Sequence, residues 1–268
     1  MRTVEAVQKD VWGCDDLDVV PLTILIASRE VGAVLIGAYD DTSLAGFVYG
    51  FPGYEAGKVT HHSHMLAVKR AYRNHDLGYK LKLAQRERVL AQGINQITWT
   101  FDPLQSLNAY FNFAKLGVVA DTYKVNFYGE TTSSFLHKIG TDRLWVLWQL
   151  ESQRVRERLQ TKPKKPSLES EVASSLVQVG PNLAPLRNES RDVLNQQKIS
   201  IEIPHDINSL QTAKPGLAVE WRLATRWAFT EALGIGYYVD DFDRSTREGQ
   251  PIGIYLLGHC ERGFRTVR

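Results

Sequence analysis

The stretch "VKRAYRNHDLGYKLKLAQRE", residues 68–87, contains the features that decide the fold. A strand-like run ends at Val68, and the apolar residues from Leu77 onward recur with the spacing of an amphipathic helix. A short polar turn joins the two. A helix N-terminus presents unpaired N–H groups and the positive end of the helix dipole, so a turn at this place is suited to hold a phosphate. The same residues are also compatible with an ordinary surface connection between a strand and a helix.

The helix that follows the turn is predicted to bury one face and expose the other. Its apolar face is expected to contain Leu77, Leu81, Ala84, Val89 and Ala91. The residues expected to lie largely outside are Lys80, Lys82, Arg86 and Glu87. Gly93 stands where a helix C-cap is expected.

The composition is that of an ordinary soluble globular protein, with 268 residues, 43% of them hydrophobic and 23% charged. The net charge of +2 gives no field that favours nucleic acid. No apolar run reaches the length of a membrane span, and the N-terminus lacks the pattern of a signal peptide. Cys14 and Cys260 have no partner spacing, which indicates reduced thiols and a cytoplasmic protein. Neither nucleic acid nor a membrane is therefore an expected partner.

The first half of the chain reads as mixed α and β. Residues 3–12 are predicted to form a strand, and Pro21 is predicted to open a helix. Two apolar runs on either side of "DDTS" predict a hairpin, followed by a strand that ends at Val68. After the motif helix, a strand is expected at "INQITWTFD" and then a helix at "SLNAYFNFAKLG" that Gly117 ends.

The second half predicts a smaller α+β module. "RVRERLQTKPKKPSLES" reads as the end of a charged helix that becomes a linker, and "QVGPNLAPLRNES" reads as a loop. We therefore expect a domain at 1–160, a linker at 161–190 and a C-terminal module at 191–268. The module is predicted to contain the strand "KISIEIP", the helix "LAVEWRLATRWAFTEAL" and the strands "YYVDDFD" and "IGIYLLG". The helix residues expected to face a sheet are Leu217, Trp221, Ala224 and Ala228.

The run V-K-R-A-Y-R-N-H-D-L-G-Y resembles the phosphate-binding motif of the GNAT superfamily of acetyl-CoA-dependent N-acyltransferases. Val68, Tyr72, Arg73 and Gly78 stand at matching positions. The predicted order of elements across roughly residues 3–130 is also similar to that family. "HSHMLAV", "TWTFDPLQ" and "NFYGE" look like a poorly characterised bacterial branch with an added C-terminal region. The resemblance implies an α/β fold with a mixed sheet: a GNAT-like N-terminal domain followed by the α+β module.

The resemblance also implies an activity, in which an amine attacks the thioester of acetyl-CoA or another acyl-CoA directly. The oxyanion donor would be a backbone amide near Leu66 to Val68, where the motif strand splays from its neighbour and also pairs with the pantetheine amides. The acceptor would be a small-molecule amine or an amino acid. The residues expected to contact CoA are Leu66, Ala67, Val68, Arg73, Asn74, His75, Asp76, Leu77, Gly78, Tyr79, Asn108 and Phe113.

Two departures from the family pattern bear on the activity. Asp76 stands at the family's first glycine, where its carboxylate repels a pyrophosphate or caps the helix that starts at Leu77. Phe113 stands where the family usually has a tyrosine that acts as general acid. Tyr110, one turn earlier, is either a substitute for that tyrosine or a packing residue. Asn108 and Asn112 are expected to share a helix face, and either bind CoA or acceptor or only pack.

The candidate general base is His64, with Glu55 as the second choice. Alternation places His62 and His64 on one face of the strand and His61 on the other. A hydrogen-bonded structural histidine is the other interpretation of His64. The pair also has metal-ligand spacing, but no third ligand is evident, so no metal is expected.

Two classes of function remain open at this stage: an acyl-CoA-dependent N-acyltransferase, and a non-catalytic acyl-CoA-binding or assembly protein on the same fold. Asp76 and Phe113 favour the second. A homodimer through the C-terminal module is compatible with both.

Overall fold

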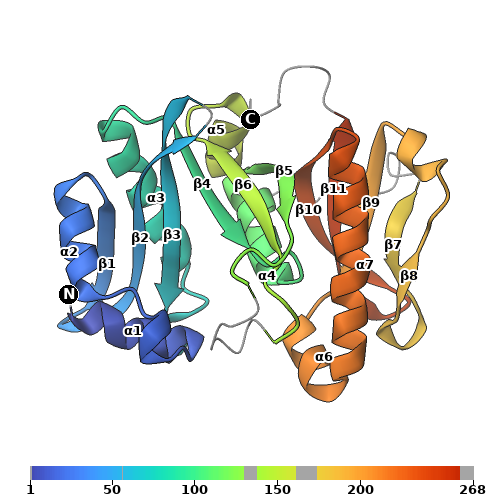
Figure 1. Cartoon of the computed structure of the whole chain (residues 1–268), viewed down its shortest axis with the longest axis horizontal. Helices are drawn as coiled ribbons and strands as arrows, with labels where there is room; N and C mark the ends of the chain where they lie inside the picture. The colour runs from blue at the N-terminus through green and yellow to red at the C-terminus, as the bar shows by residue number, and fades with distance from the viewer. Residues whose placement is uncertain (1, 56, 130–137, 161–173, 260–268) are drawn as a thin grey trace. The chain divides into compact units, whose positions relative to one another are not determined.

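The computed structural model describes residues 2–55, 57–129, 138–160 and 174–259. Contacts within the chain group it into two compact units, Met1–Trp99 with Thr131–Lys138, and Thr100–Glu130 with Ile139–Arg268. The boundary predicted near residue 161 falls inside the second of these units, and residues 161–173 of the linker predicted at 161–190 lie outside the described residues. Both units combine helices with strands, as the predicted mixed α/β class requires (Figure 1).

The first unit is a mixed sheet with helices on both faces. Its elements are α1 (Arg2–Trp12), η1 (Asp16–Asp18), α2 (Leu22–Glu30), β1 (Val34–Asp40), β2 (Ser43–Glu55), β3 (Lys58–Val68), η2 (Arg70–Tyr72), α3 (Leu77–Ala91) and β4 (Gln96–Phe101), whose last two residues belong to the second unit. β1, β2 and β3 pair antiparallel, and β3 pairs parallel with β4. The predicted hairpin is confirmed, as are the motif strand and the helix that follows it.

The strand predicted at residues 3–12 is wrong, because this segment forms the helix α1. Val4 and Val7 lie three residues apart and are both buried against the sheet, and Gln8 is buried beside them. The spacing of the valines is therefore helical, although valine itself favours strands. Packing against β2 and β3 decides between the two.

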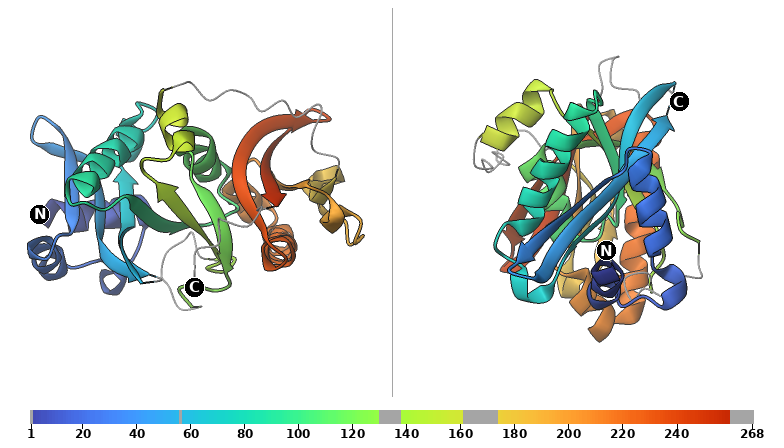
Figure 2. Two further views of the ribbon diagram at one scale, coloured as in Figure 1. Left: turned by 90° about the horizontal axis from the view of Figure 1, so that it is seen from above. Right: turned by 90° about the vertical axis from the view of Figure 1, so that its left-hand side faces the viewer.

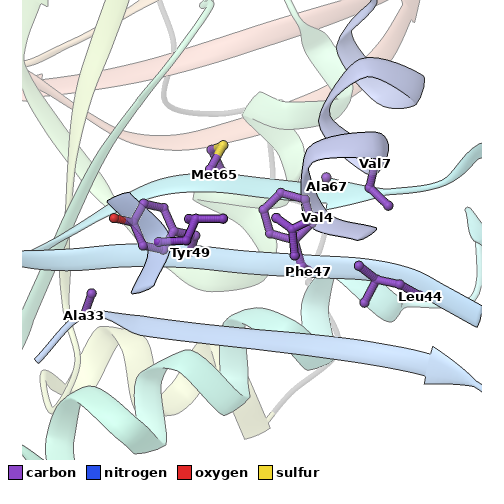
Figure 3. Close-up of a cluster of buried hydrophobic side chains, with 9 residues drawn as sticks. Val4, Val7, Ala33, Leu44, Phe47, Tyr49, Met65 and Ala67 are labelled. Carbon is purple, nitrogen blue, oxygen red and sulfur yellow. The ribbon is translucent and has the colours of Figure 1, made fainter. Parts of the chain in front are cut away.

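The two faces of the first sheet are covered by different helices (Figure 2). α1 and α2 cover one face, where Phe47 and Tyr49 of β2 pack with Met65 of β3 (Figure 3). α3 covers the other face and contacts β1, β2 and β3. α3 ends as predicted, with the amide of Gly93 donating to the carbonyl of Leu90 and a left-handed φ of 75° at Gly93.

Two predictions about the faces of α3 are wrong. Ala91 was expected on the apolar face, but it is exposed at the end of the helix. Lys82 was expected outside, but it is 2% exposed and lies against the sheet with Leu81, Gln85 and Val89. The aliphatic part of a lysine side chain packs well on an apolar surface. The Lys82 amine donates a hydrogen bond to Ser63 of β3.

The strands of the second unit also pair in a mixed arrangement, which is called the second sheet below. Its elements are α4 (Ser106–Ala109), the π-helix η3 (Tyr110–Leu116), β5 (Val119–Lys124), β6 (Arg143–Gln149), α5 (Gln153–Gln160), β7 (Ser175–Val179), η5 (Pro181–Leu183), β8 (Pro185–Arg187), η6 (Val193–Asn195), β9 (Lys198–Pro204), α6 (Ile207–Ala213), α7 (Pro215–Gly234), β10 (Tyr237–Arg247) and β11 (Gln250–His259). The strand order within this unit is β6-β5-β10-β11-β9-β7-β8. The stretch predicted as a loop at 178–190 is partly strand, because β7 and β8 pair antiparallel there.

The helix α7 runs along this second sheet, as the sequence predicted (Figure 1). Trp221, Ala224 and Ala228 are fully buried on its inner face. The indole N–H of Trp221 donates to the carbonyl of Leu183 at 2.7 Å, so the polar edge of the ring is satisfied inside the core. The strands predicted on either side of α7 are β9, β10 and β11. Within the described part of the chain, no helix is long and apolar enough to cross a membrane.

Candidate functional site

The turn between β3 and α3 is exposed and has a specific backbone shape. Arg73, Asn74, His75 and Asp76 are all exposed. Asn74 and Asp76 both adopt left-handed conformations, with φ of 66° and 53°. Asparagine and aspartate tolerate this region better than other residues that carry a Cβ. Asp76 therefore takes the backbone conformation for which a glycine would be suited.

The expectation that the Asp76 carboxylate caps α3 is wrong. Asp76 is the N-cap residue, but its side chain makes no capping hydrogen bond to the first turn of the helix. A capping side chain normally needs an extended backbone, and Asp76 has φ 53° and ψ 19° instead. The carboxylate of Asp76 therefore does not take the first amides of α3.

Arg73 and Gly78 frame this turn. The Nε of Arg73 donates to the carbonyl of Val68 at 3.3 Å, which draws the guanidinium toward the end of β3. A Cβ added to Gly78 would meet only Leu66 and Val68, at 3.8 and 3.9 Å, which is ordinary contact. Packing within the protein therefore does not require glycine here. Leu77, Gly78 and Tyr79 are half-buried where α3 begins.

Beyond its pairing with β4, one edge of β3 pairs with no strand among the described residues. The parallel ladder consists of His61 opposite Ile97 and His62 opposite Thr98 among the described residues. β3 continues for six residues after that pair and stays bonded to β2 as far as Val68. The edge of Ser63–Val68 that faces away from β2 is called the open edge below. Within it Leu66 and Val68 are half-buried, and Ala67 is buried in the core.

A β-bulge lies at the start of the open edge. Tyr49 of β2 is opposite Met65 and Gly50 is opposite Ser63, so His64 is the extra residue. The bulge moves the odd-numbered side chains from one face of the sheet to the other. Ser63 faces α3, whereas Met65 packs in the core beneath α1. Bulges are over-represented beside active sites because they re-aim side chains and end strand pairing.

The three histidines of β3 have different surroundings. The His64 side chain is exposed and approaches the rings of Tyr49 and Phe51, with centroids 6.4 and 5.9 Å away. His62 also lies near Phe51, and its Nδ1 is 3.1 Å from Oγ1 of Thr98. His61 is fully buried on the α3 side. The alternation predicted for the three rings is therefore present.

Desolvation lowers the pKa of all three imidazoles. Burial, with smaller contributions from nearby cationic groups, lowers the pKa of His61 and that of His62 to about 4. Partial burial also lowers the pKa of His64, although the residue as a whole is exposed. The neutral form of each ring is therefore favoured near neutral pH. A neutral imidazole at His64 is able to accept a proton.

Glu55 is not close to His64. Glu55 ends β2 and lies opposite Lys58, at the hairpin between β2 and β3. Lys58 and His64 are six residues apart along an extended strand, which corresponds to roughly 20 Å. The structure thus separates the two base candidates, and only His64 lies beside the open edge.

A buried polar network that the sequence did not reveal lies beneath the bulge. The Lys82 amine donates to Oγ of Ser63 at 3.0 Å and to Oε1 of Gln85 at 3.1 Å. It also lies 3.6 Å from the centroid of the Trp99 ring. Ser63 donates to Gln85 at 2.9 Å, and the Gln85 amide is 3.3 Å from Nε2 of His61. Burial lowers the pKa of Lys82 well below its usual value. The network ties β3 to α3 immediately before the bulge.

The remaining predicted site residues lie in the second unit. Asn108 is exposed on α4, whereas Asn112 is buried in the π-helix that follows. Tyr110 is half-buried, with the Arg244 guanidinium 5.5 Å from its ring. Phe113 is fully buried, and its ring contacts those of Phe101 and Tyr255. The two asparagines differ in burial because the π-helix changes the angular spacing after Tyr110. Among the described residues, no group of three side chains is arranged to hold a metal ion.

No protein-family model matches the sequence, and no curated protein matches it either. Solved structures similar to the chain include aminoglycoside 6'-acetyltransferase type Ii, with 18% identity, 57% of this chain and 90% of that chain covered, and a TM-score of 0.45. The ribosomal-protein-S18-alanine N-acetyltransferase from Escherichia coli has 11% identity, with 56% and 88% covered and a TM-score of 0.44. A GNAT family acetyltransferase from Elizabethkingia anophelis with acetyl-CoA bound has 16% identity, with 47% and 81% covered and a TM-score of 0.39. Identities and scores at this level carry no activity or substrate from those proteins to this chain.

Proposed function

We propose that this chain is an acyl-CoA-dependent N-acyltransferase of the GNAT type, which moves an acetyl or other acyl group to an amine of a small molecule or amino acid. The observation that carries the proposal is the end of the β3–β4 ladder at His62 and Thr98. Beyond it, the open edge leads directly to an exposed turn at a helix N-terminus. One ligand with an amide-bearing arm and a pyrophosphate matches both features.

The residues present fit such a ligand. An edge of unpaired backbone groups accepts an extended chain with its own amides, as in β-augmentation. The turn offers helix amides that the Asp76 carboxylate does not cap, together with the exposed Arg73 guanidinium. At Gly78 the absence of a side chain leaves space beside Leu66 and Val68 that the protein does not fill. These are properties of a cradle for CoA.

The chemistry would take place at the bulge. An amine that attacks a thioester carbonyl needs an N–H donor for the developing oxyanion and a group that takes the amine's proton. Backbone amides of the open edge supply the first. His64, with its lowered pKa and exposed ring, supplies the second. The thiol leaves without an acid residue more easily than an amine would, since its pKa is about 8.5 against about 10.4 for a lysine amine.

The test is backbone NMR of the full chain titrated with CoA, followed by turnover assays. We expect chemical-shift changes confined mainly to the open edge and residues 73–79. With acetyl-CoA and a panel of small amines and amino acids, free thiol should appear at a rate that depends on the amine. His64→Gln should lower kcat and leave the affinity for CoA unchanged. Shift changes elsewhere, or none at all, would contradict the CoA site.

The second candidate is a non-catalytic acyl-CoA-binding or assembly protein on the same fold. Phe113 favours it, because a buried phenyl ring stands where the family has its acidic tyrosine. CoA binding at the open edge without amine-dependent thiol release would select this alternative. A cytoplasmic location and a homodimer remain predictions with either function.

A further inference from the structure

A cavity of about 420 Å³ opens on the second sheet, and every residue that lines it belongs to the second unit. Its size lies in the lower part of the range of small-molecule sites, about 300–1,000 Å³. The lining is mostly polar and consists of Ser174, Ser175, Gln178, Ser200, Glu202, Ser245, Thr246, Arg247, Ile252 and Ile254. This cavity is called the hydroxyl pocket below.

The alternation of β9 explains why this face of the sheet is polar. Ile199, Ile201 and Ile203 are fully buried on the face where α7 packs. Ser200 and Glu202 point to the other face, because successive side chains of a strand alternate. Glu202 lies opposite Ile254 of β11, which also lines the pocket. The sheet thus gives its apolar face to α7 and its hydroxyl-rich face to the pocket.

The charged side chains of the lining form one pair. The Arg247 guanidinium donates to Oε1 of Glu202, and the Val179 amide donates to Oε2 of Glu202 at 2.8 Å. Glu202 is 2% exposed, whereas the Arg247 side chain is 42% exposed. The pair is neutral as a whole, with an acceptor and a donor side by side. Each carboxylate oxygen and the outer guanidinium nitrogens retain capacity for one more hydrogen bond.

Several hydroxyl groups of the pocket have unused hydrogen-bonding capacity. Ser200 is 4% exposed, and its hydroxyl makes no hydrogen bond to any residue in the described ranges. The same holds, within those ranges, for the side chains of Gln178, Ser245 and Thr246. The Ser200 hydroxyl is not among the fully buried side-chain atoms of the described residues that lack a partner, so it is open to the pocket and available to a polar ligand as donor and acceptor.

We propose that the hydroxyl pocket binds a neutral polyhydroxylated molecule of monosaccharide size. Each alcohol of such a ligand both donates and accepts, as the serine and threonine hydroxyls do. Neighbouring alcohols match the donor and acceptor of the Arg247–Glu202 pair. The C–H face of the ligand packs on Ile252 and Ile254. A charged ligand would be attracted by one member of the Arg247–Glu202 pair and repelled by the other, so the pair favours a neutral ligand.

The proposal is tested with the full chain by protein-observed NMR titration. The probes are glucose and myo-inositol as neutral polyols, glycine as a zwitterion, and inorganic phosphate as an anion. We expect saturable shifts with a polyol, centred on the lining residues of β9, β10 and β11. Ser200→Ala should weaken binding by about 2- to 12-fold, the equivalent of one hydrogen bond. Ser190→Ala, at an exposed serine outside the pocket, should leave the affinity unchanged.

Ser245→Tyr is the second variant, because Ser245 is only half-buried and a tyrosine there would occupy the cavity. It should abolish the polyol shifts without altering the fold, which keeps the test valid if Ser200→Ala is unstable. Saturable shifts with glycine or phosphate in place of the polyols would overturn the proposal. So would polyol shifts outside the pocket, or no saturable shifts with any probe. None of these outcomes depends on CoA binding.

Discussion

The Nδ1 atom of His62 lies 3.1 Å from the hydroxyl oxygen of Thr98, in the last residue pair that joins β3 to β4. This contact marks the point where the backbone ladder stops and the open edge begins. The bulge at His64 and the network around Lys82 lie within two residues of it on β3. A hydrogen bond, a change of strand register and a buried amine therefore lie together at the place where the two strands part.

Arg73→Ala should weaken CoA binding by about 1.5 to 3 kcal/mol, the range for hydrogen bonds to charged groups. Arg73 is exposed at the turn, and its guanidinium suits a phosphate. Isothermal titration calorimetry measures the affinity. Arg88→Ala, an exposed arginine in the last turn of α3, is the matched control and should bind CoA as the native chain does. Equal affinities for the two variants would remove Arg73 from the site.

Asp76→Gly should bind CoA more tightly. The change removes a carboxylate next to a negatively charged ligand and keeps the left-handed backbone that Asp76 already adopts. The gain should be larger at low salt, where charges are least screened. The melting temperature should change little, since the Asp76 side chain provides no cap.

Glu87→Gln is the control for Asp76→Gly, because it removes one exposed negative charge from the same helix away from the turn. It should alter CoA affinity less than Asp76→Gly at every salt concentration. Weaker CoA binding by Asp76→Gly would mean that the carboxylate organises the turn.

Lys82→Met should flatten the dependence of stability on pH in the alkaline range. Burial lowers the pKa of Lys82 well below its usual value of 10.5. Between the lowered pKa and 10.5 the unfolded chain binds more protons, so the free energy of unfolding rises with pH. Methionine keeps an unbranched stem near Trp99 and does not titrate. Urea unfolding from about pH 7 to about pH 10 should show a steeper rise for the native chain, and the exposed Lys80→Met should retain that rise.

His61→Gln should reduce the loss of stability in mild acid. The folded-state pKa of His61 is about 4 against 6.5 for the free side chain. The stabilising contribution is thus complete above 6.5 and is lost as the pH falls toward 4. At about 1.4 kcal/mol per pKa unit, the loss between pH 6.5 and 5 is about 2 kcal/mol. Urea unfolding at both pH values measures it, and His75→Gln in the exposed turn should behave like the native chain.

Asp102→Ala should cost about 3 to 5 kcal/mol of stability, because it leaves a buried cation without its partner. Oδ2 of Asp102 accepts from Nη2 of Arg222 at 2.7 Å, and their side chains are 6% and 2% exposed. The double variant Asp102→Ala with Arg222→Leu should recover part of the loss in denaturant unfolding. A double variant as unstable as the sum of the single variants would argue against a coupled pair.

The turn, the motif helix and most strands could be predicted because their signals are local. Val68 marks the end of the strand, Gly78 the start of the helix and Gly93 its end, and all three can be recognised within one segment. The strand prediction for residues 3–12 was wrong because its valines fit both a strand preference and a helical spacing. Only packing against the sheet beneath α1 decides in favour of the helix.

The buried network and the bulge could not be predicted from one segment. Lys82 of α3 is buried because its amine contacts Ser63 of β3 and the ring of Trp99 in β4. The bulge at His64 exists only relative to Tyr49 and Gly50 of the partner strand. Strand register and hydrogen bonds between elements depend on residues distant in sequence. The residue pattern of β3 alone therefore predicts neither the bulge nor the buried network.

The open edge also has a consequence for the aggregation of the purified protein. A strand edge that pairs with no other strand of the described residues is a template to which another chain can add. Its residues include the apolar Met65, Leu66 and Val68, which lack the lysines and prolines that blunt most sheet edges. CoA bound along this edge would cover it and prevent association between copies of the protein. Preparations stripped of CoA should therefore precipitate sooner on storage than preparations kept with it.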